Sequence, residues 1–529
     1  MKNISFIKNI FLVLLFAGFF SACSEDALDK VNFDPNHPHD VPAKFILTDA
    51  MTSTAFNVVG GDIDLYASIY MEHEAGVWNQ QFNAETRIGG EVTSATTYNN
   101  VWSFGIYPNI KEMKLVINKT SAGGTEEGNN LTGGIAKILL AYNAAILTDF
   151  FGDAPFTQTG IMNPNGTPMY MQPEIDKQAD IYQQIQSLLD EAIAQIPQGD
   201  TNPYYSTIGS HDLIYGGDGD LWIEAAYALK ARYLMHTLFR STDVNGDLNK
   251  ILDYVSKSFA SADEEFKFAQ YDGNDNVNPF FGFSYSRNSL GVSHSLAQKF
   301  KDTDDPRGDQ SFMDGSFMYA DGDPLSIDDA LDQAVPNGNP IQQQEVYPFS
   351  IVQGGVTVPT QLLSYHELLF LKAEAEARLG NTADAEVSLQ SAIEAAFANL
   401  QNSLDAADND WLEYGLETDL SQPVADDYFT NSVLDRFNAN PLQEIMLQKY
   451  LAFYGASGES GEAYNDYRRL KAMGANYVTL ENPKNAQKQF PLRYSYGTDD
   501  VTANPNIKDA YGDGSYVYTE NVWWAGGSR

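Results

Sequence analysis

The segment "AEAEARLGNTADAEVSLQSAIEAAF", residues 373–397, carries the clearest structural pattern in this chain of 529 residues. Its apolar residues recur three and four positions apart, which is the spacing of one face of an α-helix. The small residues of these faces are Ala373, Ala385 and Ala392, and the bulky ones are Leu379, Leu389 and Ile393. Gly380 stands where the first helix has to stop. Small residues let two antiparallel helices approach closely, and bulky residues fill the space between them, so we predict a helical pair here.

This pair resembles the tetratricopeptide repeat, whose unit is about 34 residues long. A generic helical hairpin is the alternative. Two earlier pairs of helical segments, 135–151 with 175–196 and 221–239 with 251–260, are candidates for degenerate copies, although their spacing is looser. A stack of such pairs would form a scaffold whose loops are free for binding.

Helical periodicity extends over most of the chain. The predicted helices are 135–151, 175–196, 221–239, 362–379, 383–400 and 441–453, with shorter ones at 42–58, 98–117 and 289–301. Loops rich in Gly, Asn, Asp and Pro are expected at 120–130, 201–220, 271–287 and 303–358. The best candidate for a strand is "GGVTVPT" at 354–360. The sequence therefore predicts a mainly α fold with long irregular loops.

The only cysteine, Cys23, lies directly after an N-terminal export pattern. The chain begins with basic residues, continues with an apolar run at 10–17 and ends this segment with Ser21 and Ala22. This order is typical of a secretory signal, and the apolar run is too short to span a bilayer. With cysteine next, it resembles a bacterial lipoprotein signal. We expect a signal peptide at 1–22, a lipidated Cys23 with a tether at 23–40, and one folded domain at 41–529.

Composition limits the partners that the folded domain can bind. The formal net charge is -39, and 43% of the residues are hydrophobic. The apolar content argues against disorder. The negative charge excludes nucleic acid as an expected partner, because its binding requires Lys and Arg to neutralise phosphates. It also disfavours strongly anionic polymers.

No catalytic motif stands out in the sequence. It contains no G-x-x-x-x-G-K-[ST] loop, no G-x-G-x-x-G after a strand and no H-E-x-x-H. Carboxylate pairs for glycoside hydrolysis stay possible, since acidic residues abound and their separation in space is unknown. We predict a protein that is not an enzyme and has no cofactor or metal centre. Structural calcium is an alternative at the acidic turns 272–276 and 302–309. The turn 243–247 begins like a calcium loop, but its glycine stands one place early and the twelfth position is Tyr254.

Aromatic residues are concentrated in three polar segments: "EAGVWNQQFNAETR" (74–87), "TTYNNVWSFGIY" (96–107) and "NPFFGFSYSR" (278–287). A sugar ring has an apolar face and a rim of hydroxyls, so its site needs flat aromatics beside amide and charged donors. The candidate ligand-binding residues are Trp78, Asn79, Asn83, Arg87, Tyr98, Phe281, Tyr285 and Arg287. The alternative is that each aromatic fastens its loop onto the core, and Trp102 is especially open to that interpretation.

Longer segments resemble one family. They include "VNFDPNHPHDVPAKFIL" (31–47), "ILTDFFGDAPFTQ" (146–158) and "LQKYLAFYGASGESGEAYNDYRRL" (447–470). Together with the lipoprotein-like start, they are similar to the SusD/RagB family of surface nutrient-binding lipoproteins of Bacteroidetes, in its starch-binding-associated branch. This resemblance implies a tetratricopeptide-like helical scaffold with an irregular ligand-binding half.

The same resemblance implies a function. It implies non-catalytic capture of a glycan, or in some members a peptide, beside a SusC-like TonB-dependent transporter. It also implies a location in the outer membrane, held by a lipid anchor and facing the cell exterior. For the ligand site it implies only the regions around Trp78 and Phe281. A surface glycoside hydrolase and a scaffold without a ligand are the alternative functions.

Overall fold

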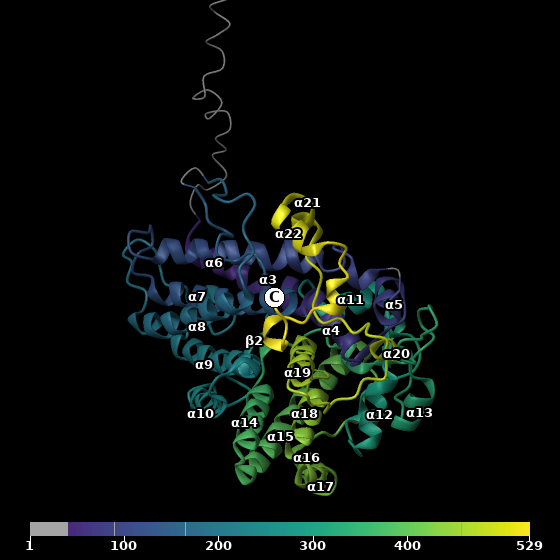
Figure 1. Cartoon of the computed structure of the whole chain (residues 1–529). Helices are drawn as coiled ribbons and strands as arrows, with labels where there is room; N and C mark the ends of the chain where they lie inside the picture. Colours follow the sequence, from purple (N-terminus) through teal and green to yellow (C-terminus); the bar gives the residue numbers. More distant parts are fainter. Residues whose placement is uncertain (1–40, 89, 164–165, 456) are drawn as a thin grey trace, which may run out of the picture. The chain divides into compact units, whose positions relative to one another are not determined.

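The computed structural model describes residues 41–88, 90–163, 166–455 and 457–529 (Figure 1). The predicted signal peptide, Cys23 and the whole of the predicted tether lie outside the described residues. Residues 43–529 form one compact unit. This unit is mainly helical, as the sequence predicts.

The predicted helical pair is present as α14 (Tyr365–Leu379) and α15 (Thr382–Ala407), which pack against each other. Ser364 caps the start of α14 by accepting a hydrogen bond from the backbone N–H of Glu367. Gly380 ends the helix with φ at 83°, a left-handed conformation that favours glycine. The small residues of the pair are fully buried, so they allow the close approach of the two helices: Ala373, Ala385 and Ala392.

Further helical pairs continue this scaffold (Figure 1). They are α7 (Asn130–Phe151) with α8 (Gln178–Gln195), and α9 (Gly219–His236) with α10 (Val244–Val255). Helix α7 is the one helix among the described residues that is long and apolar enough to cross a membrane. Because 94% of that apolar window is buried inside the protein, α7 serves here as a core helix.

The remaining helices cover the scaffold and connect its pairs. They are α3 (Ala43–Ser53), α4 (Asp64–Tyr70), α5 (Asn79–Thr86), α6 (Tyr107–Thr120), α11 (Pro279–Arg287), α12 (His294–Asp302), α13 (Ile327–Gln333), α16 (Gln422–Tyr428), α17 (Leu434–Ala439), α18 (Pro441–Ala452), α19 (Ser460–Ala472), α20 (Pro483–Ala486), α21 (Thr498–Ala503), α22 (Pro505–Tyr511) and α23 (Tyr516–Thr519).

Three short antiparallel strand pairs tie distant loops together. They are β1 (Glu74–Gly76) with β3 (Leu290–Val292), β2 (Phe266–Phe268) with β6 (Thr360–Leu363), and β4 (Phe312–Met313) with β5 (Phe349–Ser350).

Some predicted boundaries were wrong. The expected strand at 354–360 is mostly irregular, and pairing begins only at Thr360. The expected helix at 289–301 starts at His294, because Leu290–Val292 is strand β3. The expected loop at 271–287 contains α11, for which Asn278 and Pro279 supply a cap and a first helical residue.

Buried ion pairs hold α14 in the scaffold. Arg469 of α19 donates from Nη1 to Oε1 of Glu374 at 2.7 Å, and Arg232 of α9 donates from Nε to Oε1 of Glu367 at 2.8 Å. Arg469 and its neighbour Arg378 hold the pKa of the Glu374 carboxyl well below its usual range, against the opposing effect of burial. Breaking such a pair would leave a buried charge without its partner, so the pairs make α9, α14 and α19 interdependent.

Candidate ligand-binding site

Strands β1 and β3 bring two of the predicted aromatic segments together. Gly76 of β1 pairs with Leu290 of β3, and one residue further the N–H of Val77 donates to the carbonyl of Ser289 at 2.8 Å. Helix α5 follows β1, and helix α11 ends just before β3. The antiparallel pairing therefore places the start of α5 beside the end of α11, although about 200 residues separate them in the sequence.

Gly76 is required at this junction by the close approach of α5. A Cβ atom at this position would lie 2.1 Å from the carbonyl oxygen of Gln81, a separation that atoms cannot adopt. The chain can therefore turn back tightly after β1 only because residue 76 has no side chain. This turn directs the first residues of α5 toward α11.

A cavity of about 320 Å³, which we call the α5–α11 cavity, lies between the two helices. Its size falls in the range of small-molecule sites in proteins. It is lined by Trp78, Asn79, Gln80, Gln81, Asn83, Phe283, Arg287, Ser289 and Gln342. Four of the predicted site residues thus come together here: Trp78, Asn79, Asn83 and Arg287.

The lining combines ring faces with hydrogen-bonding groups. Trp78 and Phe283 are half-buried, so each keeps part of its ring accessible. Arg287 is exposed, and within the part of the chain that the structure describes its guanidinium makes no ion pair. Side-chain amides supply both donors and acceptors around these rings. The arrangement can stack an apolar ring face and bond a polar rim without any covalent step.

Four non-glycine residues in and around α5 and α11 have positive φ values. Asn79, Arg87 and Asn288 have φ values of 50°, 57° and 43°, and they lie at the ends of α5 and α11. Glu345, whose φ is 58°, accepts a hydrogen bond from Nδ2 of Asn288 at 3.1 Å. Non-glycine residues rarely adopt this region, and such positions gather at functional sites. Arg87 and Asn288 are the residues at which α5 and α11 end, where a left-handed conformation is common, and Asn79 is the one of these four residues that lines the α5–α11 cavity.

Tyr98 lies in the core, contrary to the prediction that it contacts ligand. Its side chain is fully buried, and its ring stacks on Tyr494 with centroids 4.0 Å apart. Its hydroxyl forms a 2.6 Å hydrogen bond with the hydroxyl of Tyr70. Trp102 is also fully buried and donates from Nε1 to Asp500 at 2.7 Å. For this segment the alternative interpretation holds, because its aromatics fasten the loop onto the core.

Arg87 also differs from the prediction. It lies at the end of α5 and is only 8% exposed. Its guanidinium donates to the carbonyls of Ala84 and Gln489 and lies over the ring of Tyr70, 4.7 Å from the centroid. Arg87 therefore satisfies the last carbonyls of α5 and is not available as a donor to a ligand in the α5–α11 cavity.

Phe281 and Tyr285 lie outside the α5–α11 cavity, on another face of α11. Their rings stack on each other with centroids 5.8 Å apart, and both contact Trp411 at 5.2 and 5.0 Å. Phe281 is 7% exposed, whereas Tyr285 is 44% exposed. Only Tyr285 of this pair therefore offers a ring face to solvent.

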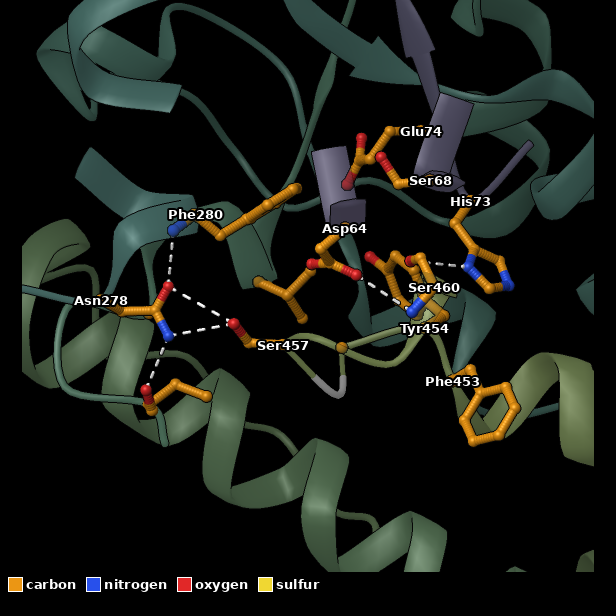
Figure 2. A pocket seen from close by; sticks show the side chains of 14 residues that line it. Asp64, Ser68, His73, Glu74, Asn278, Phe280, Phe453, Tyr454, Ser457 and Ser460 are labelled. Atoms are coloured by element: carbon orange, nitrogen blue, oxygen red, sulfur yellow. Dashed lines mark hydrogen bonds between the residues drawn. The ribbon is translucent and has the colours of Figure 1, made fainter. Parts of the chain in front are cut away.

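A second and much smaller cavity, which we call the support cavity, lies behind the first turn of α11 (Figure 2). Its volume is about 40 Å³, enough for water but not for a sugar ring. Asn278 accepts a hydrogen bond from the N–H of Phe280 at 2.8 Å and donates to the carbonyl of Val358 at 2.7 Å. Asp64 accepts from the N–H of Ser460 at 3.0 Å. The bonds of Asn278 fix the start of α11, and the bond of Asp64 joins α4 to the start of α19.

Burial changes the pKa values of three groups around the support cavity. It raises the pKa of Asp64 to about 7 and the pKa of Glu74 to about 8. It lowers the pKa of His73 to about 3. In each case burial penalises the charged form more than the local hydrogen bonds stabilise it. The support cavity is therefore lined by largely uncharged groups at mildly acidic pH.

The acidic turns considered for calcium use their carboxylates internally. Asp243 caps α10 by accepting from the N–H of Gly246 at 3.0 Å. Asp272 accepts from three backbone N–H groups of its own turn, and Asp305 binds Arg307. Among the residues that the structure describes, no group of three or more His, Cys, Asp or Glu side chains is placed to hold a metal ion.

A groove of about 420 Å³ lies against α14 and α15. Its one aromatic ring apart from His366 is that of Tyr365, and it contains the carboxylates of Asp263, Glu265 and Glu394. Compared with this groove, the α5–α11 cavity has two aromatic rings and an unpaired arginine. The lining of the α5–α11 cavity therefore fits a neutral polar ligand with apolar faces better than the lining of the groove does.

Sequence reasoning missed several residues of the α5–α11 cavity. Phe283 and the amides Gln80 and Gln81 belong to the predicted aromatic segments. The helix face on which each of them falls is the pattern that could have identified them. Gln342 lies in a loop far along the chain, and no local pattern marks it.

Comparisons with known proteins agree with this fold. A family model described as starch-binding associating with outer membrane, named SusD-like, matches residues 35–497. The crystal structure of a SusD/RagB family protein from Bacteroides thetaiotaomicron is 44% identical, with a TM-score of 0.86 over 93% of this chain and 100% of that chain. Comparison with curated proteins gave no match.

More distant structures share the fold alone. A chitin-binding protein is 21% identical with a TM-score of 0.66, and covers 91% of this chain and 99% of that chain. A SusD homologue from Bacteroides fragilis is 19% identical with a TM-score of 0.66, and covers 92% of this chain and 100% of that chain. Since the family model spans most of the sequence and the 44% identical structure is covered in full, the chain belongs to the SusD-like branch of the SusD/RagB family.

Proposed function

We propose that this protein binds a neutral or weakly charged oligosaccharide in the α5–α11 cavity and hands it to a SusC-like TonB-dependent transporter without converting it. The lining of that cavity carries this proposal, because Trp78 and Phe283 lie there beside five side-chain amides and the exposed Arg287. Aromatic faces match the C–H face of a sugar ring, and the amides and guanidinium match its hydroxyls. The net charge of -39 favours a ligand that is not strongly anionic.

The lining also favours binding over glycoside hydrolysis. Hydrolysis of this type uses two carboxyl groups flanking the glycosidic bond. None of the residues lining the α5–α11 cavity, all of which the structure describes, is Asp or Glu. Asp64 and Glu74 line the support cavity instead, whose 40 Å³ cannot admit a sugar ring.

Family membership supports the cellular setting. The matching family is described as associating with the outer membrane, and Cys23 follows a lipoprotein-like signal. We infer that lipid on Cys23 anchors the protein to the outer membrane with the folded domain facing outward. Stable anchoring takes two or more acyl chains, since a single chain binds a membrane only weakly.

A polysaccharide panel tests the ligand class. Affinity electrophoresis of the soluble domain through gels containing starch, glycol chitin, laminarin or xylan should retard the wild type on at least one of them. Trp78→Ala should reduce that retardation and weaken affinity roughly ten- to a hundred-fold, because a stacking aromatic is a major contact. Tyr204→Ala is the matched control, since Tyr204 is an aromatic that is 88% exposed outside the α5–α11 cavity.

Two results would contradict the proposal. Release of shorter sugars from the retained polysaccharide would show an enzyme rather than a binding protein. Binding of a peptide library with no retardation in any glycan gel would show that the ligand is a peptide.

A further inference from the structure

Helix α11 presents aromatic residues on two different faces. Residues four apart share one face of a helix, so Phe283 and Arg287 lie together, and Phe281 and Tyr285 lie together elsewhere. Phe283 and Arg287 line the α5–α11 cavity. Phe281 and Tyr285 contact Trp411 instead. One short helix therefore separates two aromatic surfaces.

The second surface, which we call the Trp411 face, consists of Phe281, Tyr285, Phe317 and Trp411. The rings of Trp411 and Tyr285 meet nearly at a right angle, with an interplanar angle of 78° and centroids 5.0 Å apart. Trp411 is fixed by a 3.3 Å hydrogen bond from its Nε1 to the carbonyl of Phe317, and the buried ring of Phe281 packs behind it. Trp411 is half-buried and Tyr285 is 44% exposed, so both rings remain partly open to solvent.

Polar groups flank the Trp411 face. Tyr414, which is 47% exposed, follows Trp411 by three residues and donates its hydroxyl to Asp323 at 3.0 Å. Glu345 accepts hydrogen bonds from Asn288 at the end of α11 and from Ser316 next to Phe317. Carboxylates accept hydrogen bonds from sugar hydroxyls, and side-chain hydroxyls can both donate hydrogen bonds to them and accept from them. The Trp411 face thus repeats the chemistry of the α5–α11 cavity, with ring faces beside polar groups.

Helix α11 is held firmly at both ends. Asn278 caps its start, and Nε2 of Gln344 donates to the carbonyl of Arg287 at its end, at 2.8 Å. The distance between the two surfaces is therefore fixed by the width of a helix, about 10 Å with its side chains. A short oligosaccharide can occupy one surface only, whereas a longer one can cross α11 and contact both.

We propose that the Trp411 face is a second subsite, so that the protein selects long oligosaccharides that cross α11 and contact both the α5–α11 cavity and the Trp411 face. This inference rests on the proposed function. Joining two weak contacts through one ligand raises overall affinity by roughly 10² or more without any new contact. Affinity should therefore rise steeply at the chain length that first reaches across the helix.

A length series tests this inference. Calorimetry is performed with the soluble domain and a ladder, from disaccharide to heptasaccharide, prepared by partial hydrolysis of whichever polysaccharide the panel retains. The wild type should bind the longest members roughly a hundred-fold more tightly than the shortest. Trp411→Ala should abolish this increase while leaving affinity for the shortest binding member unchanged. Trp78→Ala should weaken binding at every length.

Because Trp411 also packs on Phe281, Trp411→Ala can destabilise the fold, and a second variant is needed to test the subsite independently. Tyr285→Ala removes a more exposed ring of the same face and should also flatten the length dependence, and thermal melts confirm that each variant is folded. Equal losses at all lengths, or no loss, in both folded variants would overturn the second subsite and leave the proposed function intact. Failure of every glycan to bind would overturn the proposed function and this inference with it.

Discussion

The Glu74→Gln variant should lose less unfolding free energy than the wild type as the pH rises from 6 to 8. Glu74 is 2% exposed and lies beside the support cavity behind α11. Burial raises its pKa from 4.5 to about 8. A carboxyl whose pKa is raised in the folded state stabilises the fold fully below its unfolded pKa, and this contribution is lost as pH rises through the folded pKa.

The size of the effect follows from proton linkage. Between pH 6 and 8 the unfolded chain has lost the proton of Glu74 while the folded protein still holds it, so each pH unit removes about 1.4 kcal/mol of unfolding free energy. Allowing for partial ionisation near pH 8, the wild type should lose about 2 kcal/mol more than Glu74→Gln over this range. Asp64 and His73 also titrate differently in the folded state, but both proteins contain them, so the comparison isolates Glu74 together with its repulsion by Asp64.

Urea denaturation at pH 6, 7 and 8 measures this difference. The amide of the variant keeps an oxygen that can accept the hydrogen bond from Nε2 of Gln353, which is 3.0 Å long in the wild type. Glu417→Gln, an exposed carboxyl, is the control for the loss of one negative charge. Parallel stability curves for the wild type and Glu74→Gln would refute the assignment of a buried, protonated Glu74.

Three further predictions concern the scaffold, the anchor and the partner. Arg469→Met should lower the unfolding free energy by about 3–5 kcal/mol, because it leaves Glu374 buried without its closest charge partner. Lys372→Met removes an exposed lysine whose distance to Glu376 is 3.8 Å, and because Ser388 still donates a hydrogen bond to Glu376, this variant should cost far less in the same denaturation experiment. Equal losses in the two variants would contradict the importance of the buried pair. Cys23→Ala should move the protein out of the membrane fraction, and a variant that stays fully membrane-bound would disprove the lipid anchor. Gentle detergent extraction at native expression should recover the protein with a large outer-membrane barrel, and recovery only as a free monomer would count against the transporter partner.

The sequence was informative where local chemistry determines structure. The α14–α15 pair could be predicted because Gly380 and the small alanines act on neighbours in the chain. Trp78, Asn79 and Asn83 could be placed in one site because a single short helix and the turn before it carry all three. Asn278 and Pro279 also indicate the start of a helix, as a cap and a first helical residue. The many aromatic and polar residues after them nevertheless favoured the prediction of a loop.

Other features depend on contacts between distant segments. Tyr98 is a core residue because Tyr494, almost 400 positions later, stacks on it. Arg87 turns inward because the carbonyl of Gln489 accepts its Nε–H. Trp411 approaches α11 from the helical turn Asp408–Leu412, and Gln342 lines the cavity from a loop; no local pattern relates either segment to α11. A single sequence offers no signal for such pairings. Phe281 and Tyr285 lie on another face of α11, so together with Tyr98 and Arg87 half of the predicted site residues lie outside the cavity.

The structure of the soluble domain crystallised with the longest oligosaccharide that it binds tests the central claim most directly. We expect electron density for a sugar ring stacked on Trp78 between α5 and α11, within hydrogen-bonding distance of Arg287 and the lining amides. Density for the ligand in the groove against α14 and α15, with the α5–α11 cavity empty, would contradict it.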